Sequence, residues 1–389
     1  MNLIQDLIFV TRRPSLPSNT TTIAPRNEST VVTQAVKSPK QTDGYNLAKR
    51  LQSKCHAGTY RQQEVVFGSY FAVSTHTCII WKIGTTYLKR LYMMKKLPEF
   101  RAIINPYDIR FDKRYLPGKK ISNSPNDTRF MYVRDPYERL LSGYVDKLMA
   151  PNPVYWKIIG VPAIRMSRKS THNSNLKSFK CGHDLTFKEY ITYVIATFQS
   201  KKPNPDGHFD RMTKLCNPCK VKYDFIGKME TFAEDSIELA KKLKVSSQTL
   251  NLLKSDGGKN AWLDAVKDSV HQPFDAEFKI GYKPCISFYE AILRSWRKMQ
   301  VRGLIGKEDF PLKENQVANI TENMFIEMAV KSREQSSSSE RKTLKHNYLK
   351  EMFSTITIQD LEKIRKIYAD DFNLFEYDDT PEVIFAGRE

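Results

Sequence analysis

Residues 130–148 read FMYVRDPYERLLSGYVDKL, and their periodicity changes in the middle. The first four residues are bulky and β-prone, whereas the apolar positions after them recur at the three- and four-residue spacing of a helix. Between the two halves, Asp135 suits an N-cap, Pro136 suits the first helical position and Glu138 falls where a capping-box carboxylate belongs. The stretch therefore predicts a strand that turns directly into a helix.

Three polar side chains mark this turn. Arg134 ends the predicted strand, and Arg139 and Ser142, three residues apart, share one face of the predicted helix. A helix N-terminus attracts anions, and guanidinium groups bind phosphate or sulfate through paired N–H donors. We therefore expect an oxyanion site here, with a plain salt bridge to Glu138 as the alternative for Arg134.

The same alternation of strand and helix continues along the chain. We expect strands at residues 70–73, 130–133 and 221–226, and helices at residues 81–96, 187–198 and 358–370 and after Thr231. This pattern predicts an α/β fold with a central parallel sheet flanked by helices, in which ligands bind outside the carboxyl ends of the strands. Arg134 lies at such an end.

Composition predicts the domain organisation. Residues 1–44 are rich in Ser, Thr, Pro and Asn and predict a disordered stem, and residues 45–378 form the globular domain. Within that domain the periodicity weakens over residues 246–345, where the polar run REQSSSSER ends at Arg341. We expect an insertion or a poorly ordered loop there. Residues 379–389 form a tail, after an aromatic segment, FNLFEYDD, that is expected to dock on the core.

The charge of the chain indicates a polyanionic partner. The 389 residues carry a formal net charge of +19, which suits nucleic acid, an anionic membrane surface or an anionic polysaccharide. No nucleic-acid-binding signature is present, so nucleic acid is disfavoured. No run of about 18 apolar residues is present either, so the sequence encodes no transmembrane helix.

The cysteines and the glycosylation sequons bear on the compartment. Sequons at Asn19, Asn27, Asn126 and Asn319 favour the secretory route. Six cysteines allow one to three disulfides. Cys216 and Cys219 have zinc-ligand spacing and could be joined by Cys181 and His183, but disulfides to Cys181, Cys285 or elsewhere are favoured over zinc.

The segment RDPYERLLSGYVDK resembles the one with which Golgi-type carbohydrate sulfotransferases, which modify chondroitin, dermatan or terminal sugars of glycoproteins, hold the 3′-phosphate of the donor PAPS. Residues 208–235 and 348–378 resemble two further blocks of that family. The likeness covers residues 45–250 and 348–378 and leaves the segment between them unexplained. Every fixed position of the first segment is present: Arg134, Pro136, Arg139, Leu140, Ser142, Tyr144 and Lys147.

The loop that holds the 5′-phosphosulfate in this family is altered here. Cys78, Trp81 and Lys82 match its pattern, but the family lysine falls at Thr75 and the family hydroxyl at Ile79. The resemblance therefore implies that donor-binding residues lie in this loop, with Lys82 or His76 supplying the missing cation. The donor-binding residues are expected to be Thr77, Cys78, Trp81, Lys82, Arg134, Arg139 and Ser142. Core packing is favoured over ligand contact for Trp81 and Tyr144, and Lys147 and Lys228 have a solvated surface charge as their alternative.

The resemblance also implies a function. The chain is expected to be a PAPS-dependent sulfotransferase of P-loop-like fold that needs no metal and acts on a hydroxyl of an anionic glycan. His208 is the expected general base, with Glu230 second. Catalysis would rest on Lys82, His208 and His76. A catalytically impaired protein that binds the spent donor and glycan is the alternative. Location is expected in the Golgi, with a membrane anchor that this sequence does not encode, or outside the cell if the chain is complete.

Overall fold

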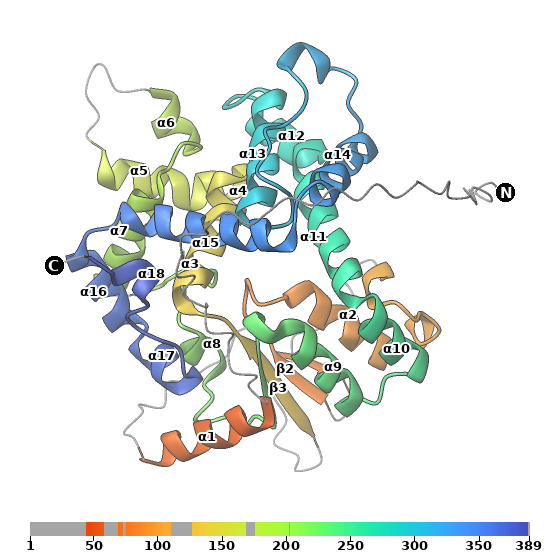
Figure 1. Cartoon of the computed structure of the whole chain (residues 1–389). Coiled ribbons are helices and arrows are strands. Elements are labelled where there is room, and N and C mark those ends of the chain that lie inside the picture. Colours follow the sequence, from red (N-terminus) through yellow and green to blue (C-terminus); the bar gives the residue numbers. More distant parts are fainter. Residues whose placement is uncertain are drawn as a thin grey trace, which may run out of the picture. The chain divides into compact units, whose positions relative to one another are not determined.

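The computed structural model describes residues 44–57, 69–72, 75–109, 127–168, 176–201 and 203–387 (Figure 1). Helices surround one small sheet with the strand order β1-β2-β3-β4. Strands β2, β3 and β4 are parallel, and β1 pairs antiparallel with β2 at the edge. The α/β prediction is thus confirmed. The strands are β1 (Ser69–Ala72), β2 (Thr75–Cys78), β3 (Thr128–Val133) and β4 (Phe225–Lys228).

Two of the three strand predictions need correction. The strand expected at residues 70–73 exists as β1, but it is antiparallel rather than parallel. The parallel neighbour of β3 is β2, which was expected to be part of a loop. Its four residues, THTC, are too few and too polar to show a period, and pairing with β3 makes them a strand. Strand β4 begins at Phe225, after the backbone N–H of Asp224 has bonded to the carbonyl of Arg129.

The turn from β3 into α3 (Pro136–Tyr144) forms as predicted. The Asp135 carboxylate accepts a hydrogen bond from the Glu138 N–H at 2.9 Å. Glu138 does not close the capping box, because its carboxylate pairs with Arg134 and Lys345 instead. Glu230 takes its place and accepts from the Asp135 N–H at 3.0 Å. Helix α3 continues into a π-helical turn, η4 (Val145–Met149).

Two of the other predicted helix starts are confirmed, one is shifted and one lacks its expected cap. Helices α7 and α16 begin behind the expected caps, Thr186 and Thr357. Helix α2 begins at Thr85 rather than at residue 81, because Lys82 and Gly84 have positive φ values that no α-helix accommodates. Before α9 the Thr231 hydroxyl donates to Asp235 and forms no cap.

The remaining bounds complete the element order. The short helices are η1 (Pro98–Phe100), η2 (Pro106–Asp108), η5 (Trp156–Gly160), η6 (Met229–Thr231) and η7 (Glu314–Gln316). The α-helices are α1 (Gly44–Ala57), α2 (Thr85–Lys96), α4 (Pro153–Tyr155), α5 (Val161–Ser167), α6 (Leu176–Cys181), α7 (Phe187–Gln199), α8 (Met212–Cys216), α9 (Phe232–Lys242), α10 (Ser247–Ser255), α11 (Gly257–Phe274), α12 (Ala276–Tyr282), α13 (Phe288–Val301), α14 (Glu322–Glu334), α15 (Ser338–Ser354), α16 (Ile358–Ile367), α17 (Ala369–Phe375) and α18 (Glu382–Phe385).

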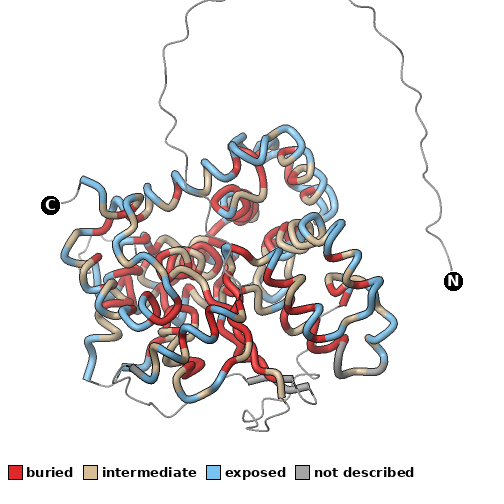
Figure 2. The backbone as a smooth tube through the Cα atoms, turned by 60° about the horizontal axis from the view of Figure 1, so that its bottom comes forward, coloured by how far each residue is buried: buried red, intermediate tan, exposed pale blue. Residues whose placement is uncertain are grey.

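The hydrophobic core has two main parts, seen as buried segments in Figure 2. One surrounds the sheet and includes residues of α1, α2 and α9. The other lies among α3, α5, α7 and the C-terminal helices α15 to α17. Phe372, Leu374 and Phe375 of the aromatic segment are buried, so its predicted docking is confirmed.

Residues 246–345 are helical, which corrects the expectation of a poorly ordered loop. Helices α11, α13 and α14 share a core of their own around Trp296, Phe310 and Phe325. The run REQSSSSER spans the end of α14 and the start of α15, where Ser337 and Glu340 form a capping box. Its serines therefore reflect a helix boundary. That the segment is an insertion relative to its relatives stays a prediction.

All six cysteines form disulfides, which overturns the zinc alternative. The pairs are Cys55–Cys219, Cys78–Cys216 and Cys181–Cys285. Among the sequon asparagines, Asn319 is exposed, and the other three lie outside the described residues, as do residues 1–43 of the expected stem. In the part of the chain that the structure describes, no helix has the length and apolarity to cross a membrane.

Candidate functional site

Arg134 lies directly after the end of β3. Its Nη2 atom pairs with Glu138 Oε2 at 3.0 Å, which is the salt bridge expected as the alternative. Its Nε atom is buried and meets no hydrogen-bond acceptor among the described residues. Burial opposes ionisation of Glu138, but Arg134 and Lys345 outweigh it and lower the pKa of that carboxyl to about 2. Arg134 is therefore paired with Glu138 and still has an Nε–H that an anion could accept from.

Ser142 lies on α3, eight residues and about two helical turns after Arg134, and is partly exposed. Arg139, one turn before it, does something other than expected. It is almost fully buried and donates to three backbone carbonyls: to Trp81 at 3.2 Å, to Asp210 at 2.7 Å and to Gly207 at 2.7 Å. These contacts hold two loops against α3, so Arg139 is a scaffold residue rather than a phosphate ligand.

The loop between β2 and α2 runs from Ile79 to Gly84. Lys82 adopts a φ of 71°, and the Thr85 hydroxyl donates to the Ile80 carbonyl at 2.6 Å, so the loop is tightly curved. Trp81 is 39% exposed, which corrects the expectation of core packing, whereas Tyr144 is buried as expected. The Trp81 ring covers Gly207 so closely that a Cβ there would lie 2.3 Å from it.

Three of the expected site residues lie in β2 and not in the loop. Thr77 and Cys78 are buried, and Cys78 is bonded to Cys216. His76 pairs with Asp127 at 2.6 Å, beside the start of β3. Thr75, the position of the family lysine, pairs with Thr128 at that same end. Because ligands of parallel sheets bind at the carboxyl ends of strands, His76 lies towards the wrong end of β2 for the candidate site. Thr77 and Cys78 lie at the carboxyl end, but both are buried and the sulfur of Cys78 is held in a disulfide.

Lys82 lies in a cluster of charges that sequence reasoning missed. Asp146 Oδ2 accepts from Lys82 Nζ at 2.8 Å and from Lys147 Nζ at 3.1 Å, and Asp146 Oδ1 accepts from Lys298 Nζ at 2.6 Å. Burial alone would raise the pKa of Asp146, but the three ammonium groups outweigh it and hold the pKa well below its usual range. Burial lowers the pKa of Lys82 to about 8, although Asp146 opposes this.

His208 lies next to the same loop, with its ring centroid 5.4 Å from that of Trp81. Its Nδ1 atom is 2.7 Å from Asp206 Oδ1, and because a carboxylate only accepts, Nδ1 is the protonated nitrogen. The Tyr155 hydroxyl is 3.1 Å from the same atom. Burial lowers the pKa of His208 against the opposing effect of Asp206, and the nearby Lys147 and Lys82 lower it further. A neutral imidazole with an orientated ring results.

Glu230, the second candidate base, has another role. Its carboxylate accepts from the Asp135 N–H and from the Tyr377 hydroxyl at 2.9 Å, and so ties the C-terminal segment to the start of α3. Lys228 lies 4.0 Å from the centroid of the Tyr377 ring and is buried rather than solvated. Of the partners that sequence reasoning missed, Asp206 had a signal, since an Asp two residues before a His often accepts from that residue's N–H, as it does here at 2.9 Å.

Comparisons with known proteins show which proteins this chain is similar to. A model of the sulfotransferase family matches residues 77–262. Carbohydrate sulfotransferase 12 of Mus musculus is 34% identical over 123 residues, which are 31% of this chain and 29% of that protein. For carbohydrate sulfotransferase 9 of Homo sapiens the identity is 38% over 110 residues, 28% of this chain and 24% of that protein.

Carbohydrate sulfotransferase 11 of Rattus norvegicus is 35% identical over 170 residues, 41% of this chain and 47% of that protein. The chain thus spans less than half the length of each of these curated relatives. No solved structure matches it. The matched residues contain the strand end at Arg134, the loop with Lys82 and the segment with His208. Residues 77–262 are thus similar to the sulfotransferase family, and the relatives that this chain resembles are named carbohydrate sulfotransferases.

Proposed function

We propose that this chain transfers a sulfuryl group from PAPS to a hydroxyl of a glycan, either a chondroitin-like chain or an N-acetylgalactosamine or uronic acid of a glycoprotein. One observation carries the proposal: the folded chain places a cation, Lys82, in the same loop as Trp81, whose ring lies 5.4 Å from that of an orientated imidazole, His208, and Lys82 lowers the pKa of that imidazole. Sulfuryl transfer needs both, because negative charge builds on the leaving oxygen while the acceptor hydroxyl loses a proton.

The residues at the end of β3 fit the 3′-phosphate of the donor. Arg134 keeps a buried Nε–H without an acceptor among the described residues, and Ser142 offers a hydroxyl on α3, the helix that follows. Lys82 and Lys147 would hold the 5′-phosphosulfate end, since their ammonium groups share one carboxylate oxygen and their side chains are 18% and 22% exposed. The donor, when bound, supplies the sulfuryl group and a phosphate leaving group.

His208 would act as the general base. Its Nδ1–H is held by Asp206, which leaves Nε2 as the acceptor for the proton of the glycan hydroxyl. The lowered pKa of His208 keeps the ring unprotonated at neutral pH. The net charge of +19 would attract an anionic acceptor to this site.

Three disulfides support an oxidising compartment, and we extend the proposal to the Golgi lumen of the secretory pathway. A membrane anchor of the kind expected for the family belongs to the same proposal.

The impaired glycan-binding alternative rests on one specific feature. Ile79, where the family has a hydroxyl, is buried and offers no donor to a phosphosulfate. Incubation of the purified chain with labelled PAPS and a panel of desulfated glycosaminoglycans and glycoprotein glycans separates the possibilities. Transfer to any acceptor supports the enzyme. Donor binding without transfer supports the alternative, and absence of both would overturn the two together.

The same assay, run as a single turnover, tests which cation serves the leaving group. Lys82→Ala should lower the transfer rate by roughly two to three orders of magnitude, as loss of one transition-state contact does. His76→Ala is the matched control, since it removes the other expected cation from the far end of β2. Equal losses in the two variants, at equal stability, would contradict the assignment of Lys82.

A further inference from the structure

Helix α13 belongs to the segment between residues 250 and 348, which the family resemblance leaves unexplained. One of its side chains nevertheless contacts Asp146 in the candidate site. Lys298 of this helix is fully buried, and its Nζ approaches Asp146 Oδ1 at 2.6 Å and Gln272 Oε1 at 3.0 Å. Lys82 and Lys147 occupy the other carboxylate oxygen. Asp146 therefore meets one ammonium group from the buried side and two from the partly exposed side.

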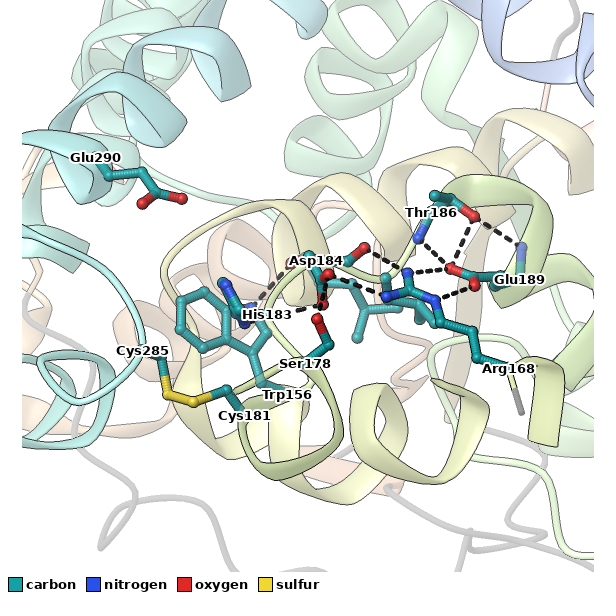
Figure 3. A network of polar contacts seen from close by, with 12 residues as sticks. Trp156, Arg168, Ser178, Cys181, His183, Asp184, Thr186, Glu189, Cys285 and Glu290 are labelled. Atoms are coloured by element: carbon teal, nitrogen blue, oxygen red, sulfur yellow. Dashed lines mark hydrogen bonds and ion pairs between the residues drawn. A yellow bond between two sulfur atoms is a disulfide. The ribbon is translucent and has the colours of Figure 1, made fainter. Parts of the chain in front are cut away.

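Helix α13 is held firmly in this position. The Cys181–Cys285 disulfide joins the turn before α13 to the end of α6, next to the network in which Arg168 binds Asp184 and Glu189 (Figure 3). One helical turn before Lys298, Arg294 donates to the His183 carbonyl at 2.6 Å and lies over the Trp156 ring. These contacts fix the depth at which Lys298 enters the site.

The charges of the cluster explain why such a lysine is needed. A carboxylate 2.8 Å from Lys82 cancels much of the field that this cation would exert on an anionic ligand. Lys298, which also lies 3.5 Å from the exposed carboxylate of Asp268, adds a buried positive charge on the other oxygen of Asp146, so that three ammonium groups face the one buried carboxylate. Without Lys298, the carboxylate of Asp146 would face the ammonium groups of Lys82 and Lys147 alone.

We propose that Lys298 is a positioning residue that neutralises Asp146 from its buried side and thereby leaves the ammonium groups of Lys82 and Lys147 available to the phosphosulfate end of the donor. This inference rests on the proposed function for the identity of the ligand. It gives the helical segment a role at the site, because without α13 the carboxylate of Asp146 would pair with Lys82 and Lys147 alone.

The surroundings of Lys82 predict how its titration responds. Asp146 and Lys147 face it from η4, Lys298 and Arg302 face it from α13, and it is close enough to His208 to influence that ring. Lys298 is one of the charges that lower the pKa of Lys82. In Lys298→Met the pKa of Lys82 should therefore rise above its value of about 8, while burial, the largest cause of the lowered pKa, remains in place.

The experiment follows Lys82 directly, by NMR titration of ¹³C-methylated lysines with Lys82→Arg to assign the signal. Lys298→Met should raise the pKa of Lys82, and Lys298→Arg should leave it nearly unchanged. Lys283→Met is the matched control, because that lysine is exposed and belongs to the same segment. An unchanged pKa of Lys82 in Lys298→Met would overturn the proposal.

Two further measurements distinguish a positioning role of Lys298 from a purely structural role. In transfer assays Lys298→Met should lower kcat about tenfold or more and change the donor KM less, because the cation acts mainly in the transition state. The double variant Asp146→Asn/Lys298→Met should recover part of that loss, which a purely structural role of Lys298 would not allow. The double variant also tests the proposal if Lys298→Met does not fold, because it removes the charge of Asp146 together with that of its buried partner.

If no acceptor is sulfated but the pKa of Lys82 rises in Lys298→Met, the proposed function fails and the positioning role stands. If transfer is normal in wild type and insensitive to Lys298, the positioning role fails alone.

Discussion

At the scale of single residues, the site depends on side chains that satisfy two demands at once. Arg134 pairs with Glu138, which fixes its guanidinium, and still presents an unpaired Nε–H. Arg139, five residues later, carries the same guanidinium group, but it donates its hydrogen bonds to the backbone carbonyls of Trp81, Gly207 and Asp210. The difference comes from burial, because a fully buried guanidinium must find acceptors within the protein.

Arg134 therefore has a measurable role of its own. Arg134→Ala should weaken binding of the spent donor, which keeps the 3′-phosphate, by about 10-fold to 100-fold, since a charge-assisted contact contributes about 1.5–3 kcal/mol. Isothermal titration calorimetry measures this directly. Arg101→Ala, at an exposed arginine, is the control and should bind as the wild type does. Unchanged affinity in Arg134→Ala would remove this residue from the site.

At the scale of elements, the site is assembled from segments that are short and irregular. The β2–α2 loop turns through two positive φ values at Lys82 and Gly84, and the loop that carries His208 closes against it. Arg139 and the contact between Trp81 and Gly207 join the two loops. A change at this contact should therefore affect both loops together.

Gly207→Ala tests that coupling. The added Cβ would meet the Trp81 ring at 2.3 Å, so the ring must move, and overpacking of this kind typically costs about 1–3 kcal/mol. We expect lower stability in urea unfolding, altered tryptophan fluorescence and reduced transfer. Gly258→Ala in α11 is the matched control, because nothing lies within 4 Å of its Cβ position, and it should be neutral or slightly stabilising. Normal activity and fluorescence in Gly207→Ala would show that the loops are not coupled here.

At the scale of the whole molecule, disulfides tie distant segments to the sheet and to the site. Cys55–Cys219 and Cys78–Cys216 join α1 and β2 to the region around α8, and Cys181–Cys285 joins the segment of residues 246–345 to α6. The last pair closes a loop of 104 residues ahead of α13. Its loss should thus act on stability and on the position of Lys298.

The double substitution Cys181→Ser/Cys285→Ser should lower the free energy of unfolding by about 2–4 kcal/mol and also lower transfer by the folded protein. Cys55→Ser/Cys219→Ser is the matched control, since it should cost similar stability but leave Lys298 in place. Denaturant unfolding and single-turnover rates at a temperature where both variants are folded provide the comparison. Equal effects of the two variants on transfer would argue against a specific role for the Cys181–Cys285 bridge.

The sequence by itself determined the features that a few adjacent residues specify. The β3–α3 turn, its Asp135 cap, the caps at Thr186 and Thr357, and the docking of the aromatic segment follow from local periodicity and hydrogen bonding. The positions of Arg134 after the strand and of Ser142 on the helix follow for the same reason, because strand end and helix start are encoded in one continuous stretch.

Only the tertiary structure decided the pairing of β2 and the charged partners of Asp146. Strand β2 exists because β3, more than 45 residues later, pairs with it, and no period in four residues could reveal that. The partners of Asp146 come from three separate segments, and Lys298 lies more than 150 residues away from that carboxylate in the chain. Buried charges must be neutralised by whatever the fold brings near, so their partners, and with them the electrostatics of the site, are a property of the packed chain rather than of any motif.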